Sequence, residues 1–337
     1  MFQKTATKQQ QTQKPARASS KARDGSKSRE PKGASGFDVY QRVTDKLLTA
    51  LETCGTWERP WLGVAGSSAM PVNVMTARQY RGTNVVMLWM AGMEGGYSSN
   101  VWGTFKQWQD KGAQVRKGES GTPILWFSIL ERQGEPTEQG DGTMQRVPFA
   151  RCSWVFNAAQ VDGYESAATI ATDPERFDPI EQAEALMLAS SATILHTGTT
   201  AFYRPSTDEI VLPPRDAFVA TSTASAAEGY YGTALHELVH WSGAKARMDR
   251  DLTGRFGSDA YAAEELVAEL GAAFLCASLG VSLEPRADQA AYLRNWIEIL
   301  RNDKRAFVTA AAKASRASDY LLAMVSGESA AEQLPES

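Results

Sequence analysis

The sequence predicts an α+β protein of two domains, in which an α+β domain is followed by a mainly helical domain with a small sheet. With 337 residues the chain is long enough to build two hydrophobic cores. Between them the segment GYESAATIATDPERFDP loses its apolar pattern and gathers Pro and Asp, which is typical of a linker. We therefore expect the domains at 37–165 and 179–326, joined by a linker at 166–178.

The two ends of the chain differ from the domains in composition. Residues 1–36 hold nine Lys or Arg against two acids, so they carry +7 and leave −11 for the rest of a chain whose net charge is −4. This tail is rich in Gln, Ser, Lys and Pro, so we expect it to be disordered. It is either a nucleic-acid-binding arm or a solubilising tail. Residues 327–337 are expected to form a second flexible tail.

The overall composition, 43% apolar and 22% charged, is that of an ordinary soluble globular protein. No apolar run approaches the roughly 20 residues of a membrane span, and the N-terminus lacks the apolar core of a secretion signal. The cysteines Cys54, Cys152 and Cys276 lie far apart, which suits reduced thiols. We therefore expect a cytoplasmic protein with no membrane partner.

The first domain shows alternating signals for helices and strands. FDVYQRVTDKLLTALETCG at 37–55 predicts an amphipathic helix, and 70–90 holds short apolar runs that Pro and Gly interrupt. A short helix is expected between Thr104, its N-cap, and Gly112. GTPILWFSILE and RVPFARCSWVFN are predicted to be two strands joined by a polar loop.

Aromatic and basic residues are interleaved between Trp57 and Lys117. Proteins that bind single strands combine aromatic rings, on which bases stack, with cations that follow the phosphates. The alternative is that most of these rings belong to the core. The candidate contacts with single-stranded DNA are Tyr80, Arg81, Asn84, Trp102, Lys106, Arg116 and Lys117.

The second domain is expected to begin with a helix at 180–191, followed by a strand pair in TTAFYRPSTDEIVLP. The proline-free segment YYGTALHELVHWSG predicts a buried helix that stops near Gly243. AYAAEELVAELGAAFLCASLG predicts another buried helix, ended by Gly280. Helices at 286–302 and 303–324 complete the domain.

Two of the three histidines, His236 and His240, lie four residues apart with Glu237 beside the first. Residues four apart on a helix share a face, so both imidazoles project toward one opening. Such nitrogens bind a zinc-like ion, and a neighbouring carboxylate can take a proton from water. This HExxH pattern predicts a metal site with Glu237 as the catalytic base, against the alternative of two packed core histidines.

A catalytic zinc usually takes three protein ligands, and the remaining histidine, His196, lies far upstream in a strand or its turn. The third ligand is therefore expected to be acidic. Glu265 and Glu269 share one face of the following helix, whereas Glu264 points away from it. We predict Glu265 as the third ligand of one Zn²⁺ per chain, other divalent metals being alternatives, and Glu269 as the acceptor that fixes a ligand imidazole. Glu264 is the alternative ligand. A further alternative is that these acids lie on the surface of a half-exposed helix and bind no metal.

Six motifs occur in order along the chain: RGTNVVMLW, TFKQWQDKGAQVRKGESGT, VFNAAQVDG, FYRPSTDEIVLPPRDAF, YYGTALHELVHWSGAKARMDRDL and YAAEELVAELGAAFLCASLG. Together they resemble the ArdC antirestriction family of conjugative plasmids and mobile elements, whose two modules also occur in TraC-type plasmid primases and related polyvalent proteins. The likeness runs from about residue 37 to about 325. It implies an N-terminal single-stranded-DNA-binding domain and a C-terminal zincin-like metallopeptidase domain.

Carried over to this sequence, the family's HExxH is HELVH at 236–240, and its EELxAE segment begins at Glu264. The Glu-x-x-Ala spacing also resembles that of gluzincin-type peptidases, which favours Glu265. Ala244 is a departure, because relatives often carry histidine there. This position lies past the expected helix end, so the metal site should not depend on it.

Two classes of function fit these observations. The first is a DNA-recruited zinc peptidase that acts on proteins bound to entering single strands. The second is a protein that covers single-stranded DNA against host nucleases, with a metal site that is structural or rarely used. Glu237 favours a peptidase, since a structural site needs no general base; Tyr230, Tyr231 and Tyr261 are candidate oxyanion donors, with core packing as the alternative. We expect covering of DNA to be the source of antirestriction, and the peptidase to be used separately.

Overall fold

The computed structural model describes residues 39–53, 69–133, 144–164, 179–221, 224–254, 258–281 and 290–326, which belong to one compact unit. The two predicted tails and the predicted linker lie outside these ranges. A region of helices and strands precedes a mainly helical region with a small sheet, which confirms the predicted fold class. No helix among the described residues has the length and apolar character that crossing a membrane requires.

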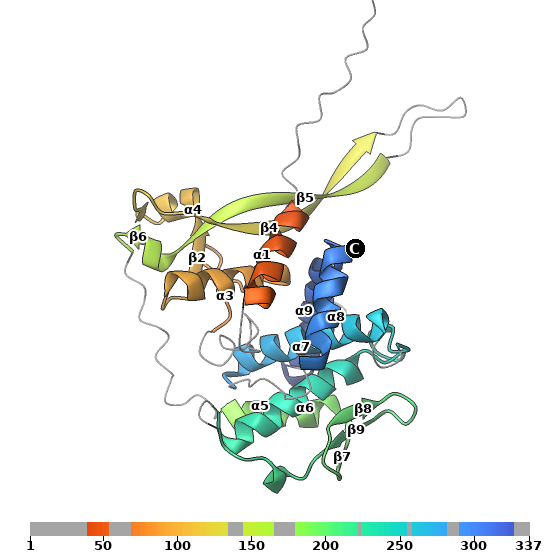
Figure 1. Ribbon diagram of the computed structural model, residues 1–337. Coiled ribbons are helices and arrows are strands. Elements are labelled where there is room, and N and C mark those ends of the chain that lie inside the picture. Colours follow the sequence, from red (N-terminus) through yellow and green to blue (C-terminus); the bar gives the residue numbers. More distant parts are fainter. Residues whose placement is uncertain are drawn as a thin grey trace, which may run out of the picture. The chain divides into compact units, whose positions relative to one another are not determined.

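The first region is a sheet with helices packed against it (Figure 1). Its elements are α1 (Val39–Thr53), β1 (Val72–Asn73), α3 (Thr83–Gly95), β2 (Val101–Thr104), α4 (Phe105–Asp110), β3 (Gln114–Val115), β4 (Thr122–Gln133), β5 (Met144–Asn157) and β6 (Val161–Asp162). The sheet order is β1-β2-β5-β4, with β1 and β2 parallel and the other pairs antiparallel. The long pair β4–β5 is the predicted hairpin, and β3 pairs with β6 separately.

The short helix α4 forms as predicted, with Thr104 as its N-cap. The Thr104 hydroxyl accepts the N–H of Gln107 at 3.2 Å, and the Gln107 side chain accepts the N–H of Thr104 at 2.9 Å. Trp108 is fully buried, and its indole N–H donates to the carbonyl of Phe156 at 3.0 Å. This contact ties α4 to β5 and leaves Phe105 exposed at the helix start.

Helix α3 was not among the predicted elements. Its sequence TNVVMLWMAGMEG is apolar on nearly every side, and residues 85–91 are all buried. Periodicity cannot separate a buried helix from a buried strand in such a run. The available signal is the glycine at each end: Gly82 and Gly96 have φ values of 57° and 62°, which favour glycine at a helix boundary.

The second region places a small sheet beside a group of helices (Figure 1). Its elements are α5 (Pro179–Ser190), β7 (Thr193–His196), β8 (Phe202–Arg204), β9 (Glu209–Leu212), α6 (Ala226–Ser242), α7 (Asp259–Leu279), α8 (Ala290–Asn302) and α9 (Ala306–Ser326). The predicted helices and the predicted strand pair are confirmed, except that residues 286–289 of the helix predicted at 286–302 lie outside the described ranges. Strand β9 pairs with β7 in parallel and with β8 antiparallel, so β8 is an edge of this described sheet.

Helices α6 and α7 pack closely because a glycine faces a valine. A β-carbon at Gly271 would lie 2.9 Å from both methyl groups of Val239, so only glycine fits at this spacing. Leu235, Leu238 and Leu270 belong to the same hydrophobic cluster and are fully buried. Burial of one such side chain stabilises the fold by about 1.5–3 kcal/mol, so this seam holds the two helices firmly together.

Gly271→Ala is expected to destabilise the protein, although alanine is the better helix former. The added methyl group must displace Val239, and such overpacking costs about 1–3 kcal/mol against a gain of about 1 kcal/mol in helix propensity. Thermal unfolding measures the difference. Gly229→Ala in α6 is the matched control, because its β-carbon would meet only Phe218, at 3.9 Å. A Gly271→Ala protein more stable than the parent would contradict the close spacing of α6 and α7.

Candidate functional site

Helix α6 carries two histidines and a glutamate into the wall of a cavity. A capping box between Ser225 and Glu228 bonds the N–H groups of its first turn. The rings of His236 and His240 have centroids 4.9 Å apart and planes at 75°. Both rings are buried, and Glu237 is 2% exposed. Helical spacing thus brings the two imidazoles to one place.

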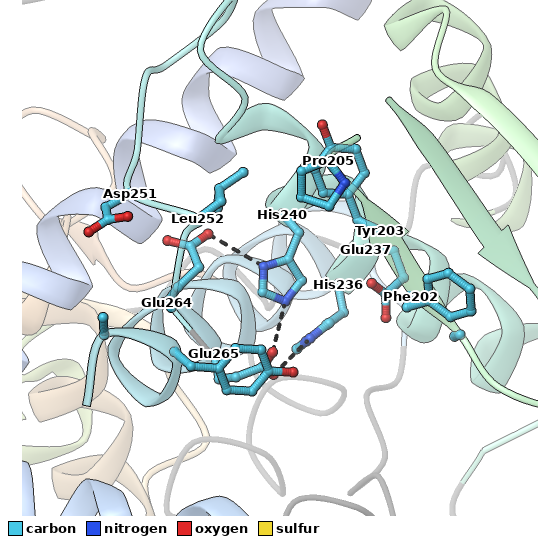
Figure 2. Close-up of a pocket in the computed structure, with 14 residues that line it drawn as sticks. Phe202, Tyr203, Pro205, His236, Glu237, His240, Asp251, Leu252, Glu264 and Glu265 are labelled. Atoms are coloured by element: carbon cyan, nitrogen blue, oxygen red, sulfur yellow. Dashed lines mark ion pairs between the residues drawn. The ribbon is translucent and has the colours of Figure 1, made fainter. Parts of the chain in front are cut away.

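Helix α7 brings Glu265 to both histidines (Figure 2). One oxygen of its carboxylate, Oε2, lies 3.6 Å from His236 Nε2, and the other, Oε1, lies 3.4 Å from His240 Nε2. One ligand atom from each residue can be chosen so that all lie within 4.8 Å of one another. Two ligands held at about 2.1 Å by a tetrahedral ion are themselves about 3.4 Å apart. The donor set therefore fits a single divalent ion.

The outer nitrogen of each imidazole also faces a carboxylate. His236 Nδ1 lies 3.5 Å from Glu269 Oε2, which is where the prediction needed an acceptor. His240 Nδ1 lies 3.4 Å from Glu264 Oε1. This contact was not predicted: Glu264 lies off the helix face that Glu265 and Glu269 share, but because the two helices cross, the histidine one turn further along α6 meets this earlier residue of α7. Such outer contacts fix the orientation of a ligand ring.

The carboxylates favour a positive charge on His240. Burial lowers the pKa of its ring, but Glu264, Glu265 and Glu237 together raise it to about 10. For Glu265, burial raises the pKa, yet the contacts with His236 and His240 outweigh it and hold the pKa below its usual range. A divalent ion that binds His240 Nε2 therefore competes with a proton.

The cavity beside these residues has a volume of about 290 Å³. Phe202 and Tyr203 of β8 line it opposite the carboxylates of α7, with the histidines between (Figure 2). Tyr261 also lines it, so this tyrosine alone among the predicted oxyanion donors is at the cavity. Tyr230 and Tyr231 are buried elsewhere on α6.

His196, Tyr230 and Tyr231 do not line this cavity, and each has a partner elsewhere. His196 Nε2 lies 2.9 Å from the hydroxyl of Tyr230, so His196 is part of a separate contact on α6. The hydroxyl of Tyr231 donates to Glu184 at 2.7 Å. Ala244 follows the end of α6, as expected.

One predicted DNA contact, Trp102, needs correction, and another, Asn84, has a structural partner. Trp102 is only 2% exposed and packs against Tyr97, with ring centroids 5.9 Å apart, so a base cannot stack on it. The side-chain amide of Asn84 makes two hydrogen bonds to the backbone of Leu125. Its oxygen accepts from the Leu125 N–H at 2.7 Å, and its nitrogen donates to the Leu125 carbonyl at 2.6 Å. The interleaving of aromatic and basic residues in the sequence does not separate a core position from a surface one.

The other predicted contacts lie at or near the surface. The phenol of Tyr80 accepts a hydrogen bond from Asn73 at 3.1 Å, and Arg81 forms an ion pair with Asp319 of α9. Both side chains thus already have partners within the protein. The remaining positions, Lys106, Arg116 and Lys117, are exposed, and among them Arg116 also forms an ion pair with Glu119 at 2.8 Å.

A surface of aromatic side chains that are not among the predicted contacts lies next to Arg116 and Lys117. It consists of Phe105, Trp154 and Phe156, and is called the aromatic surface below. Phe105 and Trp154 are 44% and 42% exposed, and the rings of Phe105 and Phe156 are 6.4 Å apart. Phe105, Phe156, Arg116 and Lys117 line a hollow of about 570 Å³. The alternation of β5, which puts Trp154 and Phe156 on one face, was the signal available in the sequence.

The fold and the centre together define a two-part protein with a zincin-like metallopeptidase domain. Residues 181–313 match the family described as zincin-like metallopeptidase. Residues 37–156 match the N-terminal domain of anti-restriction factor ArdC. The chain belongs to the ArdC antirestriction family.

Similar proteins agree with this assignment. The crystal structure of antirestriction protein ArdC from plasmid R388, in its metal-free form, is 36% identical, with a TM-score of 0.73 over 87% of this chain and 100% of that one. Its Mn(II)-bound form is 35% identical, with a TM-score of 0.68 over 86% and 98%. The zincin-like domain and this relative indicate a divalent metal site.

Two curated relatives extend the comparison. The uncharacterized protein y4eC of Sinorhizobium fredii is 42% identical over 294 residues, which is 86% of this chain and 93% of that protein. DNA primase TraC of Escherichia coli is 38% identical over 300 residues, which is 84% of this chain but 27% of the primase. The likeness to the primase thus concerns about a quarter of that protein.

Metal binding is expected to release about one proton at neutral pH. Because the pKa of His240 is about 10, its ring carries a proton at pH 7 that the ion must displace. The apparent affinity for Zn²⁺ should then rise about tenfold per pH unit between pH 6 and 8, since protons compete less as pH rises. Calorimetric titration in buffers of different ionisation enthalpy counts the protons. His196→Ala, outside the centre, should release the same number, and pH-independent binding would contradict the prediction.

Proposed function

We propose that His236, His240 and Glu265 bind one Zn²⁺, or another divalent ion in its place, and that the centre hydrolyses peptide bonds. The main support is the convergence of both Nε2 atoms on one carboxylate, at 3.4 and 3.6 Å. Two imidazoles and one carboxylate leave a fourth tetrahedral position open, which is typical of catalytic rather than structural zinc.

Glu237 is the proposed general base. When bound, a divalent ion polarises a peptide carbonyl and acidifies nearby water. Glu237 lines the same cavity as the ligands, where its carboxylate takes a proton from the attacking water and delivers it to the leaving amine. Tyr261, in the same lining, is the candidate donor to the oxyanion.

The proposed substrate is an extended stretch of protein. Strand β8 pairs with β9 on one side within the described sheet, and its residues Phe202 and Tyr203 line the cavity. An extended peptide can add to such an edge through main-chain hydrogen bonds, which places its carbonyl groups along the cavity. Proteins bound to entering DNA are the candidate substrates.

The aromatic surface is the proposed binding site for single-stranded DNA. Phe105 and Trp154 present exposed rings, and the guanidinium of Arg42 lies 5.2 Å from the centre of the Trp154 ring. Lys117, at the neighbouring hollow, is suited to contact phosphate. Bases in a duplex are already stacked on each other, so a surface of this kind favours single strands.

We infer that covering single-stranded DNA in the cytoplasm is the source of antirestriction, and that the peptidase is a separate activity. Covering a strand requires only the first region and its cations. The alternative is that DNA recruits the peptidase to proteins bound on the entering strand; a general base beside the ligands favours this alternative. Both are compatible with membership of the antirestriction family.

Glu237→Gln is expected to lower hydrolysis of a denatured protein substrate by roughly 10² to 10⁴, because proton transfer is lost while the ligands are kept. Zinc content, measured by atomic spectroscopy, and single-strand binding should be unchanged. Glu265→Ala is the contrasting variant and should lose most of the zinc as well as the activity. Unaltered hydrolysis by Glu237→Gln would refute its role as the base. Loss of protection of incoming DNA in a conjugation assay, with zinc and DNA binding intact, would show instead that proteolysis is the main task.

Phe105→Ala and Trp154→Ala are each expected to weaken binding of a labelled oligothymidine by about 1–3 kcal/mol, the usual worth of one stacked base. Lys117→Ala should reduce the slope of log affinity against log salt by about 0.7. Fluorescence anisotropy measures both. Trp126→Ala is the matched control. This ring is 41% exposed, but its cross-strand partner is Arg151, so it lies on the face of the hairpin opposite to Trp154. Equal affinity for blunt duplex, or a larger loss with Trp126→Ala, would speak against the proposed surface.

A further inference from the structure

Arg250 is a buried cation that the mechanism above does not use. Its side chain is 4% exposed, although a guanidinium carries its charge at any physiological pH. Removing a charge from water is strongly unfavourable unless partners replace the water. The partners of Arg250 therefore indicate its purpose.

The guanidinium is bonded on three sides. Nε and Nη2 donate to the carboxylate of Glu264 at 2.8–3.2 Å. Nη2 also donates to the carbonyl of Val239 at 2.6 Å, and Nη1 donates to the hydroxyl of Ser242 at 3.0 Å. A β-carbon at Gly243 would lie 2.7 Å from Nη2, and the glycine, whose φ is −76°, is thus needed for space rather than for an unusual backbone.

Glu264 connects this guanidinium to a ligand histidine. Its Oε1 accepts from Arg250 Nη2 at 2.8 Å and lies 3.4 Å from His240 Nδ1. The opposite ring nitrogen, Nε2, lies 3.4 Å from Glu265, on the side where the metal is expected (Figure 2). The chain of contacts therefore runs from Arg250 through Glu264 to the ring of His240.

We propose that Arg250 is a positioning residue of the metal centre: it orients Glu264, and Glu264 in turn holds the His240 ring with Nε2 toward the ion. This inference rests on the metal site proposed above. A planar guanidinium grips a carboxylate at two points and fixes its orientation, which a lysine ammonium cannot do. A ring held in this way loses less freedom when it binds the ion, so affinity rises.

The two ligand histidines are held by different groups. His236 Nδ1 faces Glu269 at 3.5 Å. Arg250 instead contacts Glu264, the carboxylate that faces His240 Nδ1. Removing the arginine should therefore disturb one ligand and leave the other in place. The centre should bind metal less tightly, rather than lose its site altogether.

The test is a Zn²⁺ titration, against a competing chelator, of the full chain and its variants. Arg250→Lys, Arg250→Gln and Glu264→Gln are each expected to weaken binding 10-fold to 100-fold. The double variant Arg250→Gln, Glu264→Gln replaces the ion pair by two neutral amides, so it avoids an uncompensated buried charge. Because both residues act on the same ring, its loss should be close to that of Glu264→Gln alone and well below the product of the two single losses.

Ser242→Ala is the matched control, since it removes one contact of Arg250 without touching Glu264. It should lower the melting temperature and weaken zinc binding less than Arg250→Lys does. Wild-type affinity in Arg250→Lys and in the double variant would overturn the inference and leave Arg250 a structural residue, as would losses that simply multiply. A parent protein that binds no Zn²⁺ would instead refute the metal site itself.

Discussion

The close approach of α6 and α7 is the constraint on which the centre depends. One helix carries both histidines and the other carries Glu265, so the proposed ligand set exists only if the two helices are held at one spacing. Gly271 against Val239 sets that spacing, because any β-carbon would meet the valine methyl groups at 2.9 Å. Ligand bonds to zinc are about 2 Å long with little tolerance, so a shift of about 1 Å between the helices would open the site.

The second requirement is compensation of buried charge. Four carboxylates and two imidazoles gather at the centre, and Arg250 adds a further cation. Among the described residues, His236 and His240 each have carboxylates on both sides, and Glu264 contacts both Arg250 and His240. Buried charges are tolerated when they are paired in this way, and a divalent ion would add positive charge among acids. The polar centre is thus compatible with the apolar seam beside it.

Much of this centre follows from helical spacing, which is why the sequence predicts it. The four-residue separation of His236 and His240 fixes their shared face, and the buried character of α7 makes its acids conspicuous. Helical spacing carries no information on how two helices cross. The contact of Glu264 with His240 was therefore not predicted. Arg250 lies after α6, where no periodicity applies. The exposure of the aromatic residues was harder to predict, because Trp102 is buried in β2 whereas Trp154 is exposed on β5, and residue type does not distinguish the two.

The central claim is that His236, His240 and Glu265 bind a single divalent ion. Anomalous X-ray diffraction from crystals grown with Zn²⁺, recorded on both sides of the zinc absorption edge, locates the ion without assuming its ligands. We expect one peak at about 2.0–2.2 Å from both Nε2 atoms and from one oxygen of Glu265. A peak ligated by Glu264 in place of Glu265, or no peak between α6 and α7, would contradict it.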